Sequence, residues 1–153
     1  MTPLPQVRTT PVALGVAGLL PSLAGVVLAV VEPATRAVAA IVGGAYAALI
    51  MSFLGGMWWM QALLRSDARW WPYLLAVAPS LTGWAALLAV VGGVAPPAAA
   101  LTVLALALLA SPLGDRAIGP LLREVPAWRQ LRLTLSGGLG ALTLALALIA
   151  GRG

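Results

Sequence analysis

Three serines and two adjacent tryptophans are the side chains whose types and spacing best suit ligand binding. Ser22, Ser52 and Ser80 each lie inside a long apolar run. At 1.5 Å rise per residue, each falls near the middle of the ~30 Å hydrocarbon core. Two interpretations remain open. The serines either line a small cavity, where Trp58 and Trp59 stack on an apolar or lipid ligand, or they bond between helices while the tryptophans fill space.

Catalytic chemistry has little support in the residue types. The sequence contains no His and no Cys, and all of its basic residues are Arg, so no serine has a His or Lys base and neither an imidazole nor a thiolate is available as a metal ligand. The four carboxylates are Glu32, Asp67, Asp115 and Glu124, which we expect in loops or at helix ends. We therefore predict no enzyme activity, no metal and no cofactor, and no proton relay of the kind that intramembrane carboxylates mark.

The composition is that of an integral membrane protein. Of 153 residues, 61% are hydrophobic and only 8% are charged, whereas soluble domains carry about 25% charged residues. A soluble chain of this length could not bury so much apolar surface. The net charge of +5 then reflects membrane topology, and nucleic acid is not an expected partner.

Five apolar runs predict an all-α bundle of five transmembrane helices in one domain, residues 11–150, after a short tail, residues 1–10. Pro21 should bend the first helix. The fourth helix is nearly uniform Leu and Ala, and we expect it to face lipid. A polar segment, 114–130, is expected to form a cytoplasmic interfacial loop. The expected helices are 11–31, 36–64, 71–91, 97–113 and 131–150.

The second of these helices should be the central packing element. Small residues recur along it at every fourth position, which lets membrane helices approach closely. The stripe wraps around the helix, so we expect it to serve several neighbours within the bundle first and contacts between subunits second. Replacing Ser52 or Gly56 by a large residue should then disrupt assembly more than the same change in the fourth helix. The predicted packing residues are Ala40, Gly44, Ala48, Ser52, Gly55 and Gly56.

Two short sequences recur at nearly the same offset. Pro21-Ser-Leu-Ala-Gly25 is echoed by Pro79-Ser-Leu-Thr-Gly83, and Ser52-Phe-Leu-Gly55 by Ser111-Pro-Leu-Gly114. Tandem helix hairpins followed by a fifth helix would give this pattern. Chance would also give it, because Leu, Gly, Ala and Ser dominate the chain.

The arginines predict the orientation. Five spans place most of them on one side, and the positive-inside rule assigns that side to the cytoplasm. We expect a bacterial inner membrane, the N-terminus inside and the C-terminus outside. The cytoplasmic arginines either set this orientation alone or also bind anionic lipid head groups. The candidate lipid contacts are Arg65, Arg69, Arg116, Arg123, Arg129 and Arg132.

Two stretches carry a family resemblance. Residues 46–59, YAALIMSFLGGMWW, resemble the Y-x-x-x-I-L-S-F-L-G-G-x-x-W pattern of the transmembrane protein 69-like family, also called domain of unknown function 3429. Residues 126–135, PAWRQLRLTL, are similar to that family's entry to its last helix. The resemblance implies a small multi-helix membrane protein of bacteria and mitochondria, without an established activity. Family members often carry His or Arg where this chain has Trp58, which puts any role of that position in doubt.

Two functions follow as expectations. The first is a non-enzymatic scaffold, assembly or accessory factor that acts through helix packing, with a membrane-protein partner or a second copy of the chain. The alternative is a binder or carrier of a small apolar or lipid ligand within the bundle.

Overall fold

The computed structural model describes residues 9–118 and 126–152, which form α-helices joined by short turns. The predicted all-α bundle is confirmed, because five stretches of this part of the chain are long and apolar enough to cross a membrane. The helices are α1 (Thr9–Ala17), α2 (Leu20–Val31), α3 (Arg36–Leu64), α4 (Trp71–Val91), α5 (Pro97–Ile118) and α6 (Pro126–Ala150).

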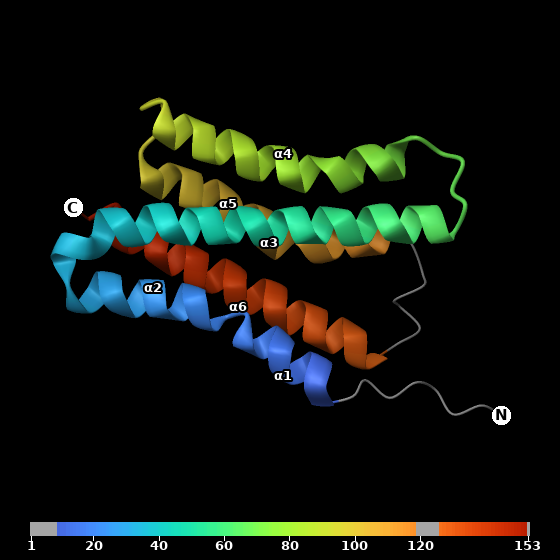
Figure 1. The fold of residues 1–153 in the computed structure, drawn as a ribbon, viewed down its shortest axis with the longest axis horizontal. Coiled ribbons are helices and arrows are strands. Elements are labelled where there is room, and N and C mark those ends of the chain that lie inside the picture. The colour runs from blue at the N-terminus through green and yellow to red at the C-terminus, as the bar shows by residue number, and fades with distance from the viewer. Residues whose placement is uncertain (1–8, 119–125, 153) are drawn as a thin grey trace.

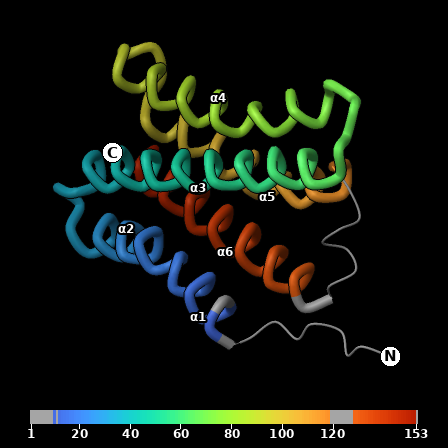
Figure 2. Tube along the Cα trace, turned by 45° about the vertical axis from the view of Figure 1, so that its right-hand side comes forward, coloured from blue at the N-terminus to red at the C-terminus, as the bar shows by residue number. Residues whose placement is uncertain are grey.

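The first apolar run is divided into α1 and α2 near the proline that was predicted to bend it. Pro21 lies in the first turn of α2, where a missing N–H costs little. The break falls at Gly18 and Leu19, and the hydroxyl of Tyr46 on α3 donates to the carbonyl of Gly18 at 2.6 Å. Figure 2 shows α1 and α2 following one another beside α6.

Helix α3 lies at the centre of the bundle, as predicted. It packs against α2, α4, α5 and α6, and Figure 1 shows it running between α4 and α2. Its inward face is made of small residues over most of its length, including Ala39, Ala40, Ala47 and Ala48. Such residues let helix backbones approach closely, which is the main source of packing energy between helices in lipid.

The expectations for α5 and for the segment after it are wrong. Instead of facing lipid, α5 buries Leu101, Leu104, Ala105 and Leu108, each at most 1% exposed. Its uniform Leu and Ala composition gave no periodic signal that separates a buried face from a lipid-facing one. In addition, α5 continues to Ile118 and α6 begins at Pro126, so the expected loop 114–130 is helical at both ends.

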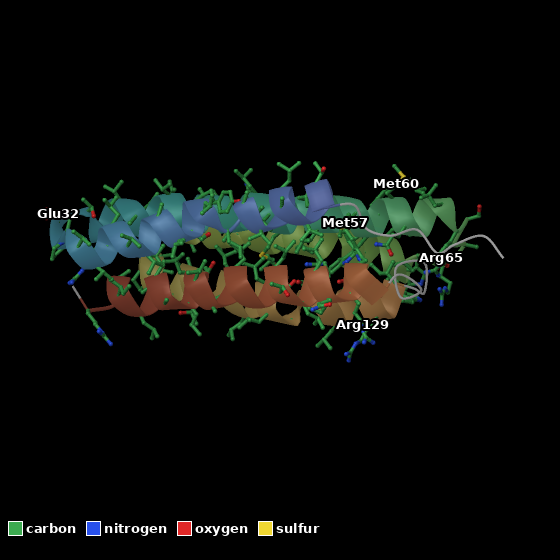
Figure 3. The ribbon with its side chains drawn as sticks, turned by 90° about the horizontal axis from the view of Figure 1, so that it is seen from below. Glu32, Met57, Met60, Arg65 and Arg129 are labelled. Atoms are coloured by element: carbon green, nitrogen blue, oxygen red, sulfur yellow. The ribbon has the colours of Figure 1, made fainter. Side chains whose placement is uncertain are left out.

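The two ends of the bundle differ in charge. Arg65 and Glu32 lie at opposite ends in Figure 3. One end of the bundle holds the start of α1 and the α3–α4 turn (Figure 1). Five arginines lie toward this end: Arg65, Arg69, Arg116, Arg129 and Arg132. Two others, Arg36 and Arg152, lie toward the opposite end. The distribution among the described residues therefore follows the predicted sides, while Arg8 and Arg123 lie outside them.

Candidate functional site

Five side chains from three helices form a buried polar cluster near the arginine-rich end of the bundle. Arg132 on α6 forms an ion pair with Asp115 on α5, with 3.0 Å between Nε and Oδ2. The indole of Trp58 on α3 donates to Oδ1 of the same carboxylate at 2.6 Å. Arg132 also donates to Ser136 Oγ at 2.6 Å and to Ser111 Oγ at 3.3 Å. We call these residues, Trp58, Ser111, Asp115, Arg132 and Ser136, the polar cluster.

Helical spacing brings this cluster together. Ser111 and Asp115 are four residues apart on α5, and Arg132 and Ser136 are four apart on α6, so each pair shares one helix face. The two faces meet because α5 and α6 pack closely against each other. Arg132 is 7% exposed and the Asp115 side chain 17%. A buried charge is tolerated only when it is paired and hydrogen-bonded. Arg132 is paired through Nε, which forms an ion pair without hydrogen-bond geometry, and is hydrogen-bonded through Nη1 and Nη2.

A proline in α5 fixes the direction of the hydroxyl hydrogen bonds. Pro112 has no N–H, so it cannot bond the carbonyl of Leu108 four residues back. The hydroxyl of Ser111 donates to that carbonyl at 2.7 Å instead. Ser111 has then used its only hydrogen. In the 3.1 Å bond between the two serine oxygens, Ser136 must therefore be the donor.

The ring of Trp58 lies directly against Gly114. A Cβ added at Gly114 would collide with the benzene ring of this indole, so a residue with a side chain would displace Trp58 from Asp115. Trp58 is 4% exposed. The N–H donor that Trp58 provides is thus engaged within the bundle.

An apolar cleft of about 220 Å³ lies between α1, α3 and α6. Its polar side chains all come from α6, namely Trp128, Arg132 and Ser136, spaced four residues apart along one face. The indole Nε1 of Trp128 is buried and has no hydrogen-bond partner among the described residues. We call this space the α6 cleft; the remaining lining side chains are apolar, and include Leu19, Ile50, Met57, Leu135 and Leu139.

A second cleft of about 280 Å³ lies between α3, α4 and α5. Trp58 and Ser111 reach its wall, together with Pro79 and Thr82. Because Ser111 lines this cleft and its bonding partner Ser136 lines the α6 cleft, the polar cluster lies between the two spaces. It therefore joins α3, α5 and α6 between the two clefts.

The structure does not bring the three predicted serines together. Ser22 is buried, Ser80 is half-buried and Ser52 is exposed, and none of them lines either cleft. The interpretation that the three serines line one cavity is wrong, because depth in the membrane fixes only the height of a residue along its helix. Its direction depends on helix rotation, which is about 100° per residue.

The paired tryptophans also separate. Trp58 faces inward to the polar cluster, whereas Trp59 is 42% exposed and forms an edge-to-face contact with Tyr73, with 5.1 Å between ring centroids. The prediction that both contact one ligand is therefore wrong, since adjacent residues on a helix point in different directions.

Four of the six predicted packing residues face into the bundle. Ala40, Gly44, Ala48 and Gly55 are buried; a Cβ at Gly55 would collide with the carbonyl oxygen of Ala76 on α4. Ser52 and Gly56 are exposed, so their assignment to packing within the bundle is wrong. The four-residue repeat advances about 400° per step, and the stripe has turned outward by this point.

The predicted lipid-contacting arginines that the structure describes fall into three groups. Arg132 belongs to the polar cluster and is not available to a head group. Arg129 projects from α6 in Figure 3 and is exposed, as is Arg116. Arg65 and Arg69 both pair with Asp67, at 2.9 Å and 2.6 Å, and the side-chain hydrogen bond from Arg69 lowers the pKa of Asp67 to about 2. Arg123 lies outside the described residues.

Sequence reasoning missed most of the residues that form this site. Ser111, Ser136 and Trp128 were not candidates, and Asp115 was expected in a loop although it lies inside α5. The four-residue spacing of Ser111 and Asp115 on one helix and of Trp128, Arg132 and Ser136 on another was the available signal. To use this spacing, one must know that α5 and α6 extend beyond the apolar runs, to Ile118 and from Pro126 respectively.

The fold and the site define a class: a helical membrane protein with a buried polar cluster beside an apolar cleft. A family model described as "Protein of unknown function (DUF3429)" matches residues 7–149. The chain belongs to this family. No curated protein matches the chain, and no solved structure does.

Proposed function

We propose that this protein is a non-enzymatic membrane protein that binds a small apolar or lipid molecule in the α6 cleft. The observation that carries the proposal is the composition of that cleft. Its walls are almost entirely apolar, and its polar end holds a buried indole N–H without a partner among the described residues. Buried polar groups are nearly always hydrogen-bonded, and an apolar pocket with few polar groups is typical of ligand sites.

The size of the cleft limits the occupant. Its volume of about 220 Å³ exceeds the roughly 150 Å³ of an engineered cavity that binds benzene. It is smaller than the about 300 Å³ at which pockets for drug-sized ligands begin. The occupant is therefore a small molecule, or one end of a longer amphiphile whose tail extends into the bilayer.

Filling the cleft tests this function. Leu135 lines the cleft, and Leu133 on the same helix is 49% exposed. Leu135→Trp fills the cleft, and Leu133→Trp adds the same bulk outside it. Each protein is extracted into native-lipid nanodiscs, and the bound small molecules are quantified by mass spectrometry. We expect a species retained by wild type and Leu133→Trp and depleted at least fivefold in Leu135→Trp. Identical contents in all three would refute the proposal.

We propose helix packing against a partner as a second function, which a scaffold, assembly or accessory factor requires. The supporting observation is that Ser52 and Gly56 face outward, with nothing within 4 Å of a Cβ at Gly56 among the described residues. Gly56→Ile should abolish a stoichiometric complex recovered in mild detergent, while Leu49→Ile, at another exposed α3 position, should leave it intact. Wild-type protein that remains a single-chain species in the membrane would contradict this function.

We further propose a bacterial inner-membrane location with the N-terminus inside and the C-terminus outside, and kinship with the transmembrane protein 69-like proteins. The arginine distribution supports the orientation. Arg116 and Arg129 are exposed at the proposed cytoplasmic end and are candidates for anionic lipid binding. Because the chain has no Cys, single cysteines at Ser66 and Gly93 allow a direct test. An impermeant thiol reagent should label the Gly93 position in intact cells and the Ser66 position only after lysis.

A further inference from the structure

We infer that the ligand of the α6 cleft is an uncharged molecule with a hydrogen-bond-accepting oxygen, such as a carbonyl, that receives the N–H of Trp128 and an N–H of Arg132. This inference rests on the proposed function and specifies the chemistry of its ligand.

The cleft offers donors that lack acceptors. Trp128 and Arg132 are one helical turn apart on the same face of α6, and both line the cleft. An indole nitrogen is a donor only, and a guanidinium carries five N–H donors and no acceptor. Trp128 Nε1 has no partner among the described residues. Of the two hydrogens on Arg132 Nη1, the bond to Ser136 uses one. A ligand must therefore bring the acceptor.

The hydroxyls of the cluster leave no donor for a ligand. Ser111 donates to the Leu108 carbonyl, and Ser136 consequently donates to Ser111. The hydrogen of a ligand hydroxyl could donate only to the oxygen of Ser136, one lone pair of which already accepts from Arg132. The polar end of the cleft therefore favours an acceptor over a donor.

The charge balance favours an uncharged ligand. The positive charge of Arg132 is already matched by Asp115, at 3.0 Å between Nε and Oδ2. A carboxylate or phosphate in the cleft would add an unmatched negative charge to an apolar, largely buried site, which is strongly unfavourable. A carbonyl oxygen accepts both N–H groups without adding charge.

Three probes of similar size separate these features: ethylbenzene has no acceptor, acetophenone has a carbonyl, and benzoate has a charge. The whole chain, labelled with ¹³C-methyl Met and ¹⁵N-Trp, is titrated in nanodiscs. The Met57 methyl lines the cleft and reports occupancy. The Met60 methyl is on a residue that is 54% exposed and points away from the bundle (Figure 3), so it reports probe dissolved in lipid. The indole N–H of Trp128 reports hydrogen bonding.

We expect ethylbenzene and acetophenone to shift Met57 beyond Met60, and only acetophenone to move the Trp128 indole proton downfield. Trp128→Phe, which also assigns the resonance, should weaken acetophenone about three- to tenfold, as for loss of one hydrogen bond, and leave ethylbenzene unchanged. The indole shift is measured on the unaltered chain, so it decides the question even if the variant folds poorly.

The remaining outcomes overturn distinct claims. If both neutral probes shift Met57 and the indole proton responds equally to each, the cleft binds ligands but the acceptor assignment is wrong. If benzoate occupies the cleft as tightly as acetophenone, the assignment of an uncharged ligand is wrong. If no probe shifts Met57 beyond Met60, the proposed function itself fails.

Discussion

Two segments of this protein share nearly the same four-residue sequence but differ in the burial of their serines. Ser52-Phe-Leu-Gly55 lies on α3 and Ser111-Pro-Leu-Gly114 on α5. Both glycines lie in close contacts, with the Ala76 carbonyl and with the Trp58 ring respectively. The serines differ: Ser52 is exposed on the surface of the bundle, whereas Ser111 is 6% exposed and belongs to the polar cluster.

The second letter of the motif explains part of this difference. Phe53 retains its N–H and can complete the α3 hydrogen-bond ladder, so Ser52 is not needed there. Pro112 leaves the Leu108 carbonyl unpaired within the helix, and Ser111 supplies the missing donor at 2.7 Å. A small polar residue in a membrane helix thus takes its role from the helix backbone beside it and from the neighbour it faces. The tandem-hairpin interpretation of this echo stays a prediction.

The largest expected effect comes from breaking the ion pair of the buried segment. Arg132→Met leaves Asp115 without its cation in a largely buried site, which we expect to cost about 3–5 kcal/mol of unfolding free energy. Arg129→Met, on the exposed face of the same helix, removes the same charge and should change stability by less than about 0.5 kcal/mol. Steric-trap unfolding in bicelles measures the unfolding free energy of both variants. Equal losses would show that the cluster has no special role.

The glycines come next. Gly114→Leu should displace Trp58, and Gly55→Leu should push α4 away at Ala76. Because both changes overpack a close contact, each should lower the unfolding free energy by at least about 1–3 kcal/mol. Gly56→Leu, one residue from Gly55 on the exposed face, should be close to neutral for the single chain. Measuring the unfolding free energies of the three variants tests this order of effects. A destabilisation by Gly56→Leu as large as that by Gly55→Leu would contradict the described orientation of α3.

A smaller difference is expected for the serines themselves. Ser111→Ala removes an acceptor of Arg132 and leaves the Leu108 carbonyl unpaired, so it should cost about 1–3 kcal/mol. Ser52→Ala should cost about zero, because its side chain is exposed. This ranking contrasts with the expectation from sequence that a large residue at Ser52 disrupts assembly more than the same change in the fourth helix. Thermal unfolding of the two alanine variants in one detergent, measured side by side, would show the order directly.

The smallest effect concerns the turn outside the membrane. The hydrogen bonds from Arg69 lower the pKa of Asp67 from 3.8 to about 2. A carboxylate with a lowered pKa stabilises the fold above its unfolded pKa and loses that contribution as pH falls through the folded value. The contribution should therefore be constant above about pH 4 and decline toward pH 2. The melting temperature of Asp67→Asn should not show that decline; a difference between the two proteins that varies above pH 5 would contradict this assignment.

The sequence predicted the architecture well and the site poorly, for physical reasons. Long apolar runs bounded by charged or proline-containing turns gave α3 and α4 their observed bounds. The charged residues at the end of α5 and the start of α6, among them Asp115 and Arg132, led to the prediction of a loop where the structure has helix. Their attraction depends on α5 and α6 lying side by side, which no local pattern encodes. The exposure of Ser52 likewise depends on which faces of α3 are covered by the four helices that pack against it.

A double-mutant cycle on Asp115 and Arg132 tests the central claim most directly, namely that these side chains form one buried unit at the α5–α6 contact. The cycle compares Asp115→Asn, Arg132→Met and the double variant by unfolding free energy in bicelles. We predict that the double variant is more stable than the sum of the single losses implies, by at least about 1 kcal/mol, because residues in one ion-pair network couple. Losses that add within about 0.3 kcal/mol, as for independent sites, would contradict it.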